Sequence, residues 1–117
     1  MIPQTSTAQR MIGTFATHGI TSGMLVQLQH LQELALAINL QGQHLIHLDL
    51  FGQRSGVQQL TIAGCARENH WRPGIERTPR YLIEIPAGGD EMVLRDVQAE
   101  LGNAAADLMQ LLGEDAQ

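Results

Sequence analysis

The chain has 117 residues, the length of one ordinary domain, and 44% of them are hydrophobic, which is enough to build a core. Its formal net charge of −5 and isoelectric point near 5.4 argue against a protein that adheres to nucleic acid or to an anionic membrane through charge. A single cysteine excludes a disulfide within the chain and fits a reducing compartment.

The sequence shows neither the charged start and apolar stretch of a signal peptide nor an apolar run near the roughly 18–20 residues of a membrane span. We therefore expect a cytoplasmic protein with no membrane contact. No cofactor-binding motif is present, so we expect no cofactor.

Two helices are predicted before any strand. Thr5 to Thr7 supply N-caps for a helix over about residues 7–18, which carries a short apolar side. A second helix over about 22–39 follows, and its apolar residues recur at steps of three and four. They are Met24, Leu28, Leu31, Ala35 and Ile38. The surplus apolar surface of this helix, at Met24, Leu25, Leu34 and Leu36, either covers a sheet or forms a dimer interface.

The stretch from His44 to Ile62 predicts a β-hairpin, because two alternating apolar runs flank a loop bounded by glycines. We expect strands over about 44–51 and 57–63. Period-two alternation directs His44, Ile46, Leu48 and Leu50 to the core face. The opposite face carries His47 and Asp49 as neighbours.

Residues 64–79 lose periodicity and contain Pro73-Gly74 and Pro79, so we expect a long irregular loop. A third strand is predicted over about 80–86, ended by Pro86. A last helix is predicted over about 90–112, with Asp90 as its N-cap. Gly102-Asn103 leaves open a break into two shorter helices.

This order of elements predicts an α+β fold in which helices cover a three-stranded antiparallel sheet, as a single domain over residues 1–117.

The predicted loop is the leading candidate for a binding site. Together with Arg80 directly after it, the loop holds four of the seven arginines, and it contains the only tryptophan. Both residue types are enriched in interface hot spots. The predicted contact residues are Arg67, His70, Trp71, Arg72 and Arg77, facing a protein partner that carries acidic groups. The alternative is structural: Trp71 holds the loop against the sheet, and the arginines pair with nearby carboxylates.

Five residues are candidates for a metal or catalytic site: His44, His47, Asp49, Cys65 and His70. His44 and His47 are three apart on a strand and face opposite sides, and no paired zinc-ligand spacing occurs. His47 with Asp49, or Cys65 with His70, has the residue types of an acid–base or nucleophile–base pair. We expect no metal site, and a small enzyme is an alternative rather than the first hypothesis.

The hairpin resembles a pattern in small phage- and prophage-encoded proteins of unknown function. The shared features are Phe51-Gly52 and then Val57-Gln58-Gln59-Leu60-Thr61-Ile62. The turn is longer here, and the histidine that often follows the glycine is absent. The resemblance implies no activity, and raises the expectation of a mobile-element protein that acts by binding.

The first hypothesis is therefore a small cytoplasmic binding or regulatory protein that acts through protein–protein contact and forms a homodimer. The alternatives are an enzyme or ligand-binding domain with a His/Asp/Cys pocket, and a small acidic dimeric chaperone.

Overall fold

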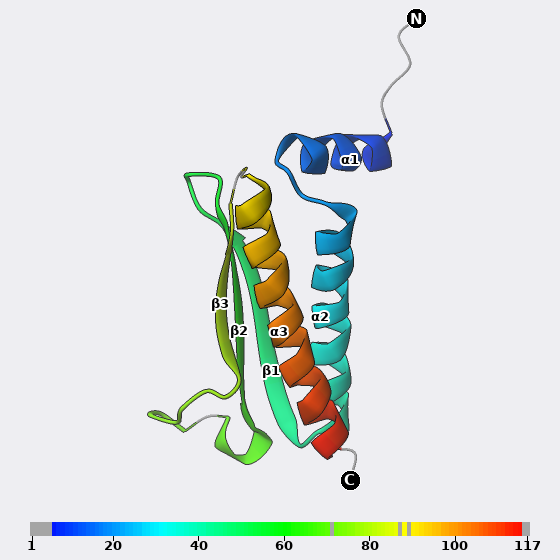
Figure 1. Ribbon diagram of the computed structural model, residues 1–117. Coiled ribbons are helices and arrows are strands. Elements are labelled where there is room, and N and C mark those ends of the chain that lie inside the picture. Colours follow the sequence, from blue (N-terminus) through cyan, green and yellow to red (C-terminus); the bar gives the residue numbers. More distant parts are fainter. Residues whose placement is uncertain (1–5, 71, 87, 89, 116–117) are drawn as a thin grey trace, which may run out of the picture.

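The computed structural model describes residues 6–70, 72–86, 88 and 90–115 (Figure 1). Their order is two helices, two strands, a short 3-10 helix, a third strand and a long helix. The elements are α1 (Thr7–Thr17), α2 (Ser22–Gln41), β1 (His44–Gly52), β2 (Gln58–Ala66), η1 (Arg67–Asn69), β3 (Arg80–Ile85) and α3 (Glu91–Asp115). The predicted α+β class and the three-stranded antiparallel sheet are confirmed.

Side-chain caps fix where the helices begin. Ser6 accepts a hydrogen bond from the Gln9 amide, and the Gln9 side chain accepts one from the Ser6 amide, which forms a capping box on α1. Thr21 caps α2, and Asp90 caps α3 by accepting from the Val93 amide. Gly42, with φ of 84°, ends α2 in the left-handed conformation.

The sheet has the order β1-β2-β3, so β1 and β3 are its two edges. The register pairs Leu48 with Ile62 across the hairpin and Ile62 with Tyr81 on the other side. Helices α2 and α3 lie side by side over one face, and the other face is open (Figure 1). The core forms between these two layers.

The core contains most of the apolar positions that the periodicity predicts. The fully buried large side chains are Met24, Leu31, Ile38, Leu60, Ile62, Ile83, Leu101 and Leu108. Met24 and Leu34 are buried within the chain against α3 and the sheet, so at these two positions the apolar surface of α2 covers the core, which is the first of its two predicted roles. Leu36 remains exposed.

Element ends shift by a few residues from the predicted ranges, and two findings bear on the predicted loop and on the predicted last helix. Strand β2 continues through Gly64 and Cys65 to Ala66, so the irregular segment begins three residues later than position 64. The reason is the nine-residue β1, which pairs with β2 as far as His44↔Ala66. Helix α3 is continuous through Gly102 and Asn103, since Leu101, Ala104 and Leu108 are buried on one side of it.

Helix α1 lies apart from this two-layer core. It runs across the N-terminal end of α2, at the end of the molecule where the hairpin turns and α3 begins (Figure 1). None of its residues is buried.

Candidate functional site

Two histidines meet at the open face of the sheet. His47 projects from β1 on the side away from the helices, and His70 follows η1, which places it over the same face. Their Nε2 atoms are 2.9 Å apart, and their ring centroids are 5.1 Å apart with planes inclined by 12°. Because the nitrogens lie between the two ring centres, the rings meet edge to edge. One ring must donate its N–H and the other must accept it.

A second pair, Cys65 and Arg77, lies at the same end of the sheet. The Arg77 Nη1 group donates to Cys65 Sγ at 2.9 Å, and the thiol is only 4% exposed. Backbone bonds from Gly64 to Pro79 and from Thr78 to Gly64 fold the chain back and bring Arg77 over β2. Cys65 lies opposite Leu45 in the ladder, and His47 is the next residue on the same face of β1, diagonally across from Cys65. The His47–His70 and Cys65–Arg77 pairs are therefore neighbours on this face.

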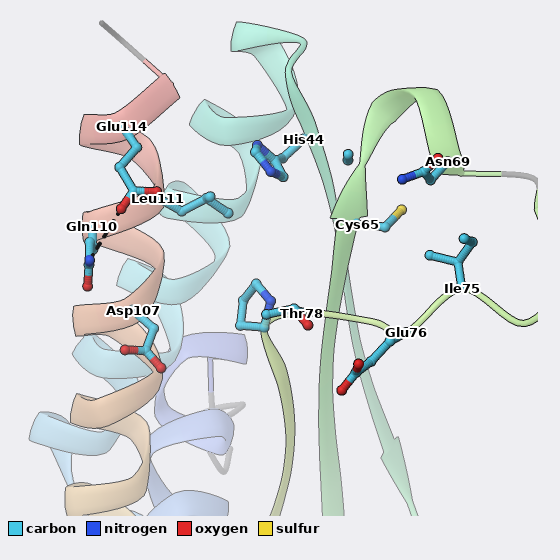
Figure 2. A pocket seen from close by; sticks show the side chains of 12 residues that line it. His44, Cys65, Asn69, Ile75, Glu76, Thr78, Asp107, Gln110, Leu111 and Glu114 are labelled. Carbon is cyan, nitrogen blue, oxygen red and sulfur yellow. Dashed lines mark hydrogen bonds between the residues drawn. The ribbon is translucent and has the colours of Figure 1, made fainter.

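An open cleft of about 400 Å³ lies between the C-terminal half of α3 and the segment that follows β2 (Figure 2). Asp107, Gln110 and Glu114 line it from α3, and Cys65, Asn69 and Glu76 are among the lining residues that β2 and the segment after it contribute (Figure 2). Asp107 accepts a hydrogen bond from the Tyr81 hydroxyl, and Gln110 donates to Glu114.

The chemistry of this cleft is acidic. Its described lining includes three carboxylates and one histidine and no arginine, so it suits a cationic group better than a phosphate. Among the residues that the structure describes, no group of three histidine, cysteine or carboxylate side chains is placed to hold a metal ion.

Of the five predicted contact residues, three form side-chain hydrogen bonds within the described residues of their own chain. The Arg67 Nη1 group donates to the Gly42 carbonyl at 3.5 Å, at the end of α2. Arg77 is held by Cys65, and His70 by His47. Arg72 is exposed in the loop and forms no side-chain hydrogen bond within the described part of the chain. Trp71 lies outside the described residues.

Sequence reasoning missed a second surface, at the α1 end of the molecule. An apolar groove of about 450 Å³ runs between α1, the start of α2 and the ends of β1 and β3, and we call it the α1 groove. Its lining residues are Thr14, Phe15, His18, Ile20, Leu25, Leu28, Leu50, Gly56, Gln58, Ile85 and Pro86. The available signal was the short apolar side of the first helix, at Met11, Ile12 and Phe15, which predicts an apolar face but not what covers it.

Comparison with family models, with curated proteins and with solved structures found no match to this chain. Within the described residues, none of the helices has both the length and the apolar character needed to cross a membrane.

Proposed function

We propose that this chain is a small binding protein that acts by contact with another protein, and that the α1 groove receives an amphipathic helix of that partner. The observation that carries the proposal is a helix that buries none of its own residues beside an apolar groove.

The argument begins with the stability of α1. A helix of 11 residues is marginal in water unless an apolar face packs against something. Met11 and Ile12 are 51% and 66% exposed, and Phe15 on the same side is only half-buried. The face that should stabilise α1 is therefore left largely in solvent.

The groove supplies the matching surface. Its walls are mainly apolar side chains from α1, α2, β1 and β3, with polar residues such as Thr14 and Gln58 among them. Apolar patches rimmed by polar groups are typical of protein-interaction sites, and an apolar helix face laid in such a groove is a recurring mode of recognition. A partner helix would cover the groove and the exposed side of α1 together.

The arginine-rich loop is the secondary contact in this proposal. Since Arg67 and Arg77 already donate to atoms of their own chain, Arg72 is the described arginine of that patch best placed to reach a partner. The loop therefore supports the proposal less directly than the α1 groove does.

The test is affinity capture with two matched baits. Ile12→Glu places a carboxylate on the exposed side of α1, and Leu40→Glu makes the same change at a 77% exposed position near the opposite end of α2. Both are helical surface sites, so both variants should melt within a few degrees of the wild type.

We expect Ile12→Glu to lower the affinity for the captured partner by about 10-fold or more, since a charge would be buried at the contact, and Leu40→Glu to leave it unchanged. The affinity is measured by titration of the purified partner. Equal affinity of wild type and Ile12→Glu would refute the proposal.

A further inference from the structure

The outer edge of β3 carries a row of backbone groups that have no partner within the described part of the chain. The Gly64 amide donates to the Pro79 carbonyl, so the backbone of residue 79 points toward β2. In an antiparallel ladder every second residue bonds to the same neighbour, so the backbone groups of Tyr81, Ile83 and Ile85 also bond to β2. The N–H and C=O groups of Arg80, Leu82 and Glu84 therefore point away from β2, toward the free edge.

The other edge of the sheet is covered by a side chain at one position and is flanked by a helix. The Asn39 side chain accepts from the Ile46 amide at 2.6 Å and donates to the Ile46 carbonyl at 3.1 Å, which occupies the outward groups of β1 at that position. Helix α2 also packs along β1. Natural proteins usually cover or charge their edge strands, since a bare edge is a template for another strand. Within the described part of the chain, β3 has no such cover.

The sequence of β3 is complementary to itself. In an antiparallel pairing centred on Leu82, Arg80 lies opposite Glu84 of the second strand, and Leu82 lies opposite its own copy. All three side chains are exposed on the open face, and Leu82 is 60% exposed. Within the described residues neither Arg80 nor Glu84 forms an ion pair. Opposite charges directly across a ladder stabilise it, whereas like charges destabilise it.

We propose that β3 is the contact surface for a second copy of this chain, paired antiparallel across Leu82 to give one continuous six-stranded sheet. The same three residues that face the free edge would form the new ladder. Each Leu82 N–H donates to the Leu82 carbonyl of the other copy, and the backbones of Arg80 and Glu84 exchange the same pair of bonds across the two strands.

The charges around β3 favour antiparallel over parallel pairing of the two copies. A groove of about 400 Å³ beside the edge is lined by Leu82, Glu84, Val93, Asp96, Val97 and Glu100. Antiparallel pairing brings Arg80 of the second copy to Glu84, at the mouth of this acidic groove. Parallel pairing in register would instead align Arg80 with Arg80 and Glu84 with Glu84.

The experiment exchanges the charges and measures the mass in solution by sedimentation equilibrium. The wild type should approach twice the 12.8 kDa chain mass as concentration rises. Arg80→Glu and Glu84→Arg should each raise the dimer dissociation constant about 10-fold or more, because each places two like-charged pairs across the axis. Arg54→Glu, at the exposed hairpin turn, is the control for the change in net charge and should dimerise as the wild type does.

Two further samples test the register. The double variant Arg80→Glu/Glu84→Arg restores opposite pairs and should dimerise as the wild type does. An equimolar mixture of the two single variants should form a heterodimer more tightly than either forms a homodimer. A wild type that stays monomeric at high concentration, single variants that dimerise normally, or a double variant that does not recover would each overturn the proposal.

The outcome is independent of the α1 groove. Ile12→Glu should leave the dimer unchanged, and Arg80→Glu should leave partner capture unchanged. A wild-type dimer that Ile12→Glu abolishes and Arg80→Glu does not would assign self-association to α1 and would overturn the β3 pairing.

Discussion

Gly64 lies at a point in the sheet where a side chain has no room. A Cβ atom there would lie 2.7 Å from Ile46 Cδ1 and 3.2 Å from the Thr78 carbonyl oxygen. The same residue donates to the Pro79 carbonyl and accepts from the Thr78 amide. Its small size therefore lets the chain before β3 fold back against β2, which in turn brings Arg77 to Cys65.

Gly64→Ala should lower the free energy of unfolding by about 1–3 kcal/mol, because the added methyl forces buried neighbours to move. Gly102→Ala is the matched control: a Cβ there meets only the Gln27 side chain at 3.9 Å, in the middle of α3. That change should raise stability by about 0.5–1 kcal/mol through helix propensity. Urea denaturation measures both, and equal effects of the same sign would contradict the close packing at Gly64.

The pairs His47–His70 and Cys65–Arg77 on the open face of the sheet could not be predicted from sequence, because their members are far apart along the chain. His47 and His70 are 23 positions apart, and Cys65 and Arg77 are 12 apart. Alternation predicted correctly that His47 faces away from the helices, but it paired that residue with Asp49 because only neighbours along a strand are visible in sequence. The partner comes from a segment without periodicity.

At the scale of elements, Asn39 joins the last part of α2 to the edge of the sheet. It forms two hydrogen bonds with the backbone of Ile46, in the manner of a neighbouring strand. These bonds satisfy edge groups that would otherwise be partly buried and unpaired.

Asn39→Asp keeps the acceptor and the size of the side chain but removes the donor to the Ile46 carbonyl. We expect a loss of about 1–3 kcal/mol in the free energy of unfolding. Asn103→Asp, at an exposed position of α3, is the control and should change stability by less than about 0.5 kcal/mol. Urea titrations that show equal stability for the two variants would show that the hydrogen bond from Asn39 to the Ile46 carbonyl contributes nothing to stability.

The elements themselves were largely predictable. Apolar residues at steps of three and four identified α2 and α3, and alternation identified the strands, because each pattern follows from burying one face of a regular element. The extent of β2 was not predictable: Gly64 and Cys65 have no strand signature, and they pair only because β1 is long enough to reach them.

At the scale of the whole molecule, the chain divides into a packed core and a helix outside it. Helices α2 and α3 and the sheet bury each other, while α1 contributes no buried residue and borders an apolar groove (Figure 1). The sequence predicted α1 but could not show that it lies outside the core, because an apolar helix face looks the same in sequence whether its own core or another protein covers it.

The central claim is that α1 stands outside the cooperative core of the free chain, and native-state hydrogen–deuterium exchange tests it most directly. Amides of α2, α3 and β2 should exchange only through global unfolding, whereas those of α1 should exchange through a local opening that needs much less free energy and hardly depends on denaturant. Exchange of the α1 amides as slow as that of α2 would contradict the account, because it would show that α1 is already fixed to the core and has no exposed face to offer a partner.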